Sequence, residues 1–416
     1  MLRALGGIGR ILAQTWPALL AWYLGGSLVR ASVIALAAPI GPESPLAALL
    51  LVPIAVLARL VSYIGMFLVL RRALPGYREA AAGDLQFHSF RDSVADFVRV
   101  LQTSIGPFFA LYAIIGLLND DLLAYGRAAY RYSFGSENGV INVGDGPLAL
   151  TVVVIAFGGR MLLTLFAKRL PNWVALPQIY LEATWVFVAL TAIGSLFGPI
   201  LEWINSRQIV RWWEGVREFL EGLWEPIRLA LEGLDGLTPV ALQVVLLPLA
   251  WILIASIIYL RSLTNVVEDA IPVPAKMSAQ VRARLSRVPM LVRNYSHIAT
   301  GAWQEVGRPL VFSSRVILSA GVRNLIIFLC AYGLLFAAGQ WMSRGLYALV
   351  GAHERAYWEN LADPVLSLIV STVTEPIRIV LLAAAFDFCL KRWRDRRMAR
   401  LEPSPELPLP GIPAAN

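Results

Sequence analysis

Long apolar runs alternate with short polar segments along most of this 416-residue chain. Within a few residues at each end, the runs are 11–38, 46–70, 93–118, 148–167, 176–200, 239–260, 316–341 and 364–390. Each run is long enough to cross a hydrocarbon core of about 30 Å as an α-helix, which rises about 1.5 Å per residue. The pattern therefore predicts an all-α, polytopic transmembrane bundle of about eight spans.

Basic residues gather in every second gap between these runs. The basic gaps hold 22 Lys and Arg against 9 Asp and Glu, and they are 1–10, 71–92, 168–175, 261–315 and 391–416. The other gaps hold 8 Lys and Arg against 15 Asp and Glu, and they are 39–45, 119–147, 201–238 and 342–363. Because positively charged loops stay in the cytoplasm, this alternation predicts that both termini lie inside.

The composition agrees with a membrane protein, since 57% of the residues are hydrophobic and only 15% are charged. That leaves too little polar material to cover a soluble protein of this size. A net charge of +8 would raise the question of nucleic acid in a soluble protein. Here the basic residues flank the predicted spans, so we expect no nucleic-acid partner. The strong preference for arginine over lysine is typical of a high-GC bacterial genome, and we expect the bacterial cytoplasmic membrane.

The first apolar run admits a second interpretation. Arg3 and Arg10 precede it, and Ala35-Leu36-Ala37 resembles a signal-peptidase site. The run is long for a secretory signal, however, and Arg30 interrupts it. We therefore expect an uncleaved first span.

We expect one multi-span domain over residues 1–400 and a disordered, proline-rich tail over 401–416. Residues 205–235 repeat apolar side chains at helical spacing, which predicts an amphipathic helix on the outer membrane surface. Residues 261–315 interleave arginines with apolar residues, which favours contact with anionic headgroups at the cytoplasmic face. This basic loop and the wider segment 201–238 are candidate docking sites for protein partners. A connector that rests on lipid explains 205–235 more simply.

The eight runs also form four out-and-back hairpins with some internal similarity. The stretch 11–28 aligns without gaps with 179–196, and both end in Gly-Ser-Leu. Arg59, Arg160 and Arg378 each lie in mid-run before a basic cluster. This favours hairpin repeats in which spans one to four match spans five to eight. Apolar sequence also produces such matches by chance.

Five ionisable residues inside the spans are the candidate site residues. Arg59, Arg160, Glu375 and Arg378 fall near the midplane, where an ion costs about 2.5–3.5 kcal/mol unless it is paired or hydrated. Glu375 and Arg378 are one helical turn apart and are expected to pair, while Glu182 lies at an intermediate depth.

Two interpretations of these five residues remain open. They form an interior site for an anionic group such as phosphate or carboxylate, or they form structural ion pairs that lock the helices together. In the second interpretation Glu182 pairs with one of the arginines. Arg30 lies far enough from a span centre to extend to the interface.

Catalytic and cofactor motifs are missing from the sequence. It contains no phosphate-binding glycine loop, no dinucleotide turn, no nucleophile elbow and no paired-histidine zinc motif. Acidic residues of the 119–147 segment, Asp120, Asp121, Glu137 and Asp145, fit no calcium-loop spacing and are expected in a solvated turn. We expect no cofactor, no metal and no enzymatic activity.

The sequence favours a permease or lipid-handling protein for an anionic or amphipathic molecule. Arg59, Arg160, Arg378, Glu375 and Glu182 are then the substrate contacts. The alternative is a non-catalytic membrane anchor or assembly subunit of a larger envelope complex. An intramembrane enzyme acting on a lipid-linked substrate is a third class, and no nucleophile near Glu182 or Glu375 supports it.

Overall fold

The fold was obtained as a computed structural model. It describes residues 6–81, 90–114, 116–132, 147–166, 174–208, 212, 215–218, 225, 228, 242–263 and 308–401. Its main helices are α2 (Ile8–Ile40), α3 (Pro45–Leu70), α5 (Phe90–Ile114), α6 (Leu117–Tyr130), α7 (Pro147–Phe166), α8 (Ala175–Asn205), α11 (Leu247–Ser262), α15 (Arg308–Leu318), α16 (Val322–Val350) and α18 (Asp363–Leu401). Shorter elements are η1 (Arg71–Ala73), α4 (Pro75–Ala80), the π-helical turns η4 (Leu242–Leu246) and η6 (Trp358–Ala362), and α17 (Arg355–Tyr357). The all-α prediction is confirmed for these residues, which contain no strand.

Six of these helices are long and apolar enough to cross a membrane. The spans are Ile8–Ile40, Pro45–Ala73, Ala175–Ala192, Val244–Ser262, Val322–Val350 and Asp363–Met398. α7 contributes a shorter apolar stretch, and the first three turns of α5 contain the charged residues Asp92, Asp96 and Arg99. The apolar helices are thus compatible with a multi-pass membrane protein. Eight spans with both termini inside, and the hairpin repeats, stay predictions.

Two of the predicted runs are broken by glycine. The run 93–118 divides at Gly116, which has a φ of 83° and separates α5 from α6. The run 316–341 divides at Gly321, with a φ of 84°, so α15 ends before it and α16 begins after it. Only glycine adopts this left-handed backbone without strain. Average hydropathy does not register such a break. Both glycines lie near an end of their run, so most of each run is still one helix, α5 or α16.

The segment 119–147, whose acidic residues were expected in a solvated turn, is partly helical. α6 covers the first part of the 119–147 segment, and residues 133–146 lie outside the described residues. Most of the predicted amphipathic helix 205–235 and of the basic loop 261–315, and all of the tail 402–416, also lie outside them.

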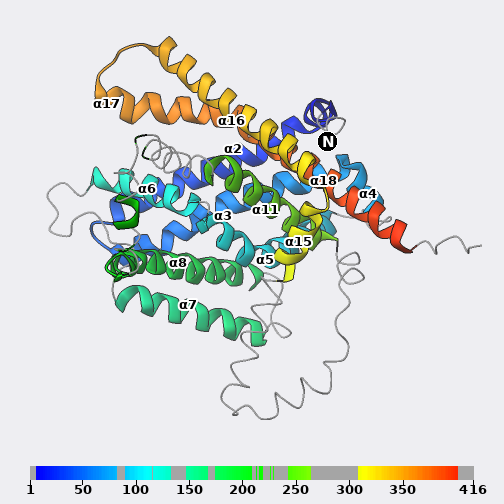
Figure 1. Cartoon of the computed structure of the whole chain (residues 1–416). Helices are drawn as coiled ribbons and strands as arrows, with labels where there is room; N and C mark the ends of the chain where they lie inside the picture. Colours follow the sequence, from blue (N-terminus) through cyan, green and yellow to red (C-terminus); the bar gives the residue numbers. More distant parts are fainter. Residues whose placement is uncertain are drawn as a thin grey trace, which may run out of the picture.

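The helices pack in layers that run from α7 to α16 (Figure 1). α7 packs on α8, and α8 packs on α5 and α3. α11 lies between α5 and α18, and α2 pairs along its length with α3. α16 and α18 form a hairpin on the opposite side from α7 (Figure 1). α3 and α11 are the most buried spans and form the centre of the bundle.

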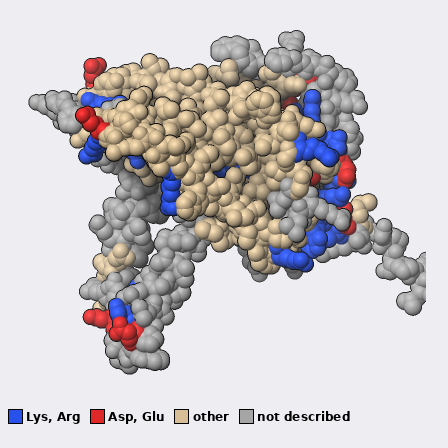
Figure 2. All heavy atoms as spheres, turned by 90° about the horizontal axis from the view of Figure 1, so that it is seen from above, with Lys and Arg blue, Asp and Glu red and all other residues tan. Residues whose placement is uncertain are grey.

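The α16 side of the molecule has a broad face with few charged side chains, and Lys, Arg, Asp and Glu gather toward its ends (Figure 2). Large apolar side chains of α16 and α18 are exposed there, among them Leu334, Phe336, Trp341 and Val365. An apolar band between charged ends matches the hydrocarbon core and interfaces of a bilayer.

A glycine contact brings α2 and α3 together. A Cβ atom on Gly26 would lie 2.4 Å from Cβ of Ser62 and 3.1 Å from the carbonyl oxygen of Ala58. The hydroxyl of Ser62 donates a hydrogen bond of 2.8 Å to the carbonyl of Trp22. Small residues allow this approach, which is a common basis of helix association in membranes.

A carboxylate from α18 holds the short helix α4 against the end of the bundle. The backbone N–H groups of Gly76 and Tyr77 donate to Oδ2 and Oδ1 of Asp387, at 3.2 and 2.7 Å. Asp387 thus satisfies two N–H groups of the first turn of α4, as an N-terminal capping residue does. A Cβ atom on Gly76 would lie 2.9 Å from Oδ1 and 3.0 Å from the carbonyl oxygen of Asp387, so a larger residue would press on this contact.

Removal of this cap is expected to weaken the fold. We expect Asp387→Ala to lower the free energy of unfolding by about 1–2 kcal/mol, because two N–H groups lose their acceptor. Titration of the detergent-solubilised protein with sodium dodecyl sulfate, followed by circular dichroism, measures this change. Asp395→Ala removes an exposed carboxylate from the same helix and should have little effect. Equal losses in the two variants would contradict the capping role.

Candidate functional site

Asp121 joins two arginines inside the bundle. Its side chain, on α6, is 1% exposed and accepts from Nε of Arg30 at 2.8 Å and from Nη1 of Arg59 at 3.0 Å. The hydroxyl of Tyr112, on α5, also donates to it. Four helices, α2, α3, α5 and α6, therefore meet at one carboxylate. A buried carboxylate with this set of donors is fully paired.

A second ion pair lies on α18. Glu375 contacts Arg378 one turn later, as the sequence predicts. Nη2 of Arg378 also donates to the hydroxyl of Tyr63 at 3.1 Å. The guanidinium lies 4.2 Å from the ring centroid of Trp251, which is fully buried, and 5.7 Å from that of Tyr63. These contacts hold the arginine head in one position.

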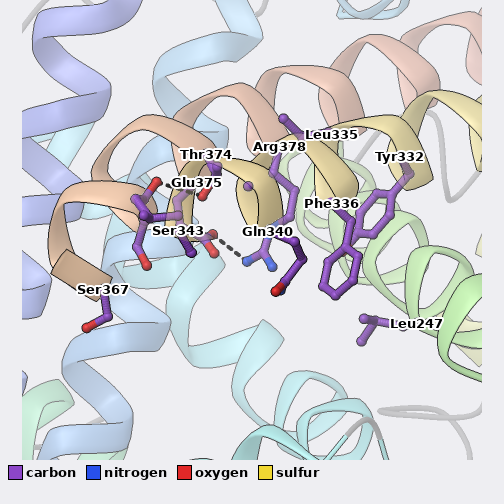
Figure 3. A pocket seen from close by; sticks show the side chains of 13 residues that line it. Leu247, Tyr332, Leu335, Phe336, Gln340, Ser343, Ser367, Thr374, Glu375 and Arg378 are labelled. Atoms are coloured by element: carbon purple, nitrogen blue, oxygen red, sulfur yellow. Dashed lines mark hydrogen bonds and ion pairs between the residues drawn. The ribbon is translucent and has the colours of Figure 1, made fainter. Parts of the chain in front are cut away.

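A cavity of about 310 Å³ opens beside this ion pair. α16 and α18 provide most of its wall, and Leu247 at the start of α11 adds to it. Figure 3 shows Arg378, Glu375 and Gln340 directed into the same space as Tyr332 and Phe336. Four hydroxyl residues, Ser343, Ser367, Ser371 and Thr374, also line it. The cavity therefore combines one cation, several hydrogen-bonding groups and apolar walls, as ligand sites commonly do.

A smaller cavity of about 90 Å³ lies next to the first. Arg30 and Arg59 line it, so it reaches the ion cluster around Asp121. Ser371 and Glu375 line both cavities and form the boundary between them. Three arginines and two carboxylates therefore meet in this region, which leaves one positive charge among these five groups.

Aromatic side chains close the bundle between the cavities and α4. The ring of Tyr259 stacks on Phe386 with a centroid distance of 5.0 Å and meets the edge of Phe67 at 5.7 Å. All three rings are fully buried. They lie on α3, α11 and α18, further toward α4 than the residues that line the cavities. The large cavity is thus closed on the α4 side by packed rings.

Arg160 and Glu182 form a pair of their own. Nη2 of Arg160, on α7, lies 3.4 Å from Oε1 of Glu182, on α8. This confirms the prediction that Glu182 pairs with one of the arginines. Neither residue lines the two cavities described above. Of the five candidate site residues, the structure brings Arg59, Glu375 and Arg378 together and joins Arg160 to Glu182 elsewhere.

Sequence analysis missed Asp121, because the predicted third run ended at residue 118. Leu118, Asp121, Tyr125 and Ala129 are the buried residues of α6 and recur at helical spacing. This helical spacing is the feature of the sequence from which the burial of Asp121 could have been predicted. The prediction of a solvated turn at Asp121 was therefore wrong. The predicted extension of Arg30 to the interface is corrected in the same way, since Arg30 instead pairs with Asp121.

Metal ligation finds no support among the described residues, where no three His, Cys, Asp or Glu side chains come together. Glu137 and Asp145 lie outside this part of the chain. No known protein family matches the chain, and no curated protein or solved structure does either. The arrangement of side chains around Arg378 is therefore the basis for a functional conclusion.

Proposed function

We propose that this protein is an integral membrane protein that receives the anionic headgroup of an amphipathic molecule in the 310 Å³ cavity, as a permease or a lipid-handling protein. One observation carries the proposal. A cavity that contains an arginine and several hydroxyl groups lies between α16 and α18, which also expose large apolar side chains to the surroundings. A molecule with a charged head and an apolar chain matches both environments.

The side chains that line the cavity support an amphipathic ligand over a free ion. Arg378 and Gln340 offer donors to an anionic head, whereas Leu335, Phe336 and Val370 line the same cavity with apolar surface. The exposed face of α16 continues this apolar surface outward. An acyl chain that leaves the cavity would therefore contact apolar side chains or lipid along its length.

Replacement of Arg378 tests this proposal. We expect Arg378→Gln to weaken the binding of lysophosphatidylglycerol at least about tenfold, because the anionic phosphodiester loses a charged hydrogen-bond donor. Native mass spectrometry of the protein in a neutral detergent counts the bound molecules and gives the affinity. Lysophosphatidylcholine, which has no net charge, should bind weakly to wild type and variant alike.

Arg323→Gln is the matched control for this experiment. It removes an exposed arginine at the far end of α16, outside both cavities, and should leave the affinity unchanged. If wild type shows no stoichiometric binding, or if Arg378→Gln binds as well as wild type, the proposed function is wrong.

The membrane in which the protein lies and its topology are part of the same proposal. The charge asymmetry of the sequence supports both termini inside and contact of the basic loop 261–315 with anionic headgroups, and the preference for arginine over lysine supports a bacterial cytoplasmic membrane. We propose no chemical reaction at the site. The alternative, a membrane anchor or assembly subunit, depends on 201–238 and 261–315, which lie mostly outside the described residues.

A further inference from the structure

Glu375 contacts the arginine of the proposed binding site and lines both cavities. Its carboxylate contacts Arg378, the same cation that would receive the anion of the ligand. It also lies on the boundary between the two cavities, with Arg378 on one side and Arg59 on the other. An anion that enters the large cavity therefore meets an arginine that already has a carboxylate partner.

Arg378 is fixed more firmly than Glu375. Its guanidinium is hydrogen-bonded to Tyr63 and lies against the fully buried ring of Trp251. Glu375, in contrast, borders open space on two sides. When the two separate, the carboxylate is thus the group that has room to move.

The small cavity is suited to a displaced carboxylate. Its volume of about 90 Å³ has room for more than one water molecule, and therefore for a carboxylate group. Arg59 supplies a positive charge there, and the hydroxyl group of Ser27 supplies a donor, whereas the hydroxyl of Ser62 donates to the carbonyl of Trp22. Among the residues that the structure describes, the carboxylate in contact with Arg59 is that of Asp121, which Arg59 shares with Arg30. Two arginines with one carboxylate leave an excess positive charge that a second carboxylate would balance.

We infer that Glu375 is an internal competitor for the anion site: a singly charged anionic headgroup displaces it from Arg378, and the released carboxylate turns to Arg59 in the small cavity. This inference rests on the proposed function and adds the selectivity of the site. The three arginines and two carboxylates carry one net positive charge, so one negative charge neutralises the cluster. A neutral headgroup cannot displace Glu375, because Arg378 would then lose its counter-ion in a low-dielectric site.

Glu375→Gln separates this role from that of an ordinary ligand contact. Removal of the competing charge is expected to tighten the binding of lysophosphatidylglycerol about tenfold or more, since one charge at close range shifts such equilibria by at least this factor. The affinity is measured by native mass spectrometry of the full chain in a neutral detergent. Glu354→Gln, at an exposed position before α17, is the control and should leave the affinity unchanged.

A double-mutant cycle tests the second half of the inference. Arg59→Gln removes the second partner of the released carboxylate and should weaken binding several-fold in the wild-type background. In the Glu375→Gln background no carboxylate has to be released, so Arg59→Gln should change the affinity much less. If Arg59→Gln changes the affinity equally in both backgrounds, the inferred movement of Glu375 toward Arg59 is wrong.

The source of the anion is tested with dimethyl phosphate, a soluble phosphodiester of the same charge. Tighter binding by Glu375→Gln supports the competitor role with either probe, and binding of dimethyl phosphate alone overturns the amphipathic ligand of the proposed function. If wild type and Glu375→Gln both fail to bind either probe, the proposed function fails. If both bind with equal affinity, only the role of Glu375 is overturned.

Discussion

Asp121→Asn is expected to lower the free energy of unfolding by about 3–5 kcal/mol, the largest effect of any single charge removal that we predict. Arg30 and Arg59 both depend on this carboxylate, which is 1% exposed. The substitution keeps the size of the side chain but removes the negative charge between two partly buried cations. Loss of one partner from a buried ion pair has this magnitude, because an uncompensated charge remains in a low-dielectric site. Titration with sodium dodecyl sulfate in mixed micelles measures the change.

The neighbouring acid provides a matched control. Asp120 precedes Asp121 on α6 but is exposed, so Asp120→Asn should alter stability by no more than about 0.5 kcal/mol. A double variant tests whether the loss of stability comes from unpaired charge or from a change in side-chain packing. Addition of Arg30→Gln to Asp121→Asn removes one of the two orphaned cations, and the double variant should be more stable than the sum of the single effects predicts. Additive losses would contradict the proposed ion cluster.

Gly26→Leu is expected to separate α2 from α3 and to lower the free energy of unfolding by about 3 kcal/mol. The reason is steric, because Cβ of any larger residue would overlap Cβ of Ser62 and press on the backbone carbonyl of Ala58. The carbonyl belongs to a helix and cannot move aside as a side chain can, so overpacking here is relieved only by displacement of the whole helix. The same mixed-micelle titration reports the loss.

Gly25 provides the control position for the Gly26→Leu prediction. It is adjacent to Gly26 on α2 but is exposed, and a Cβ atom there would meet nothing within 4 Å. Gly25→Leu should therefore be neutral or stabilising by up to about 1 kcal/mol, because leucine favours helix more than glycine does. A similar loss in both variants would show that helix flexibility, and not the α2–α3 contact, explains the effect.

The two clusters at the centre of the bundle have different energetic roles. Asp121 accepts hydrogen bonds from Arg30, Arg59 and Tyr112 and so joins four helices. Glu375 and Arg378 border open cavities, and in the proposed function their pairing is exchanged for a ligand without exposure of the core. In the proposed site, the cluster around Asp121 therefore stays in place, and the carboxylate of Glu375 is the charged group that moves.

The pairing of the ionisable residues was predictable only in part. Glu375 and Arg378 are one turn apart on one helix, so their contact follows from helical geometry. Pairing of Glu182 with an arginine followed from the scarcity of acids at the same depth, and Arg160 is that arginine. The partner of Arg59 was not predictable in this way. Asp121 comes from a helix that begins after a left-handed glycine, and hydropathy carries no record of that turn.

Local sequence determined the helical class of this protein and the positions of its long apolar segments, because hydropathy and helical rise act residue by residue along the chain. It also identified the midplane charges as the residues that require an explanation. Only tertiary structure decided which charges meet and where open space remains. Those outcomes depend on the packing of α16 against α18 and of α6 against α2 and α3, and contacts between distant segments leave no periodic signal in the sequence.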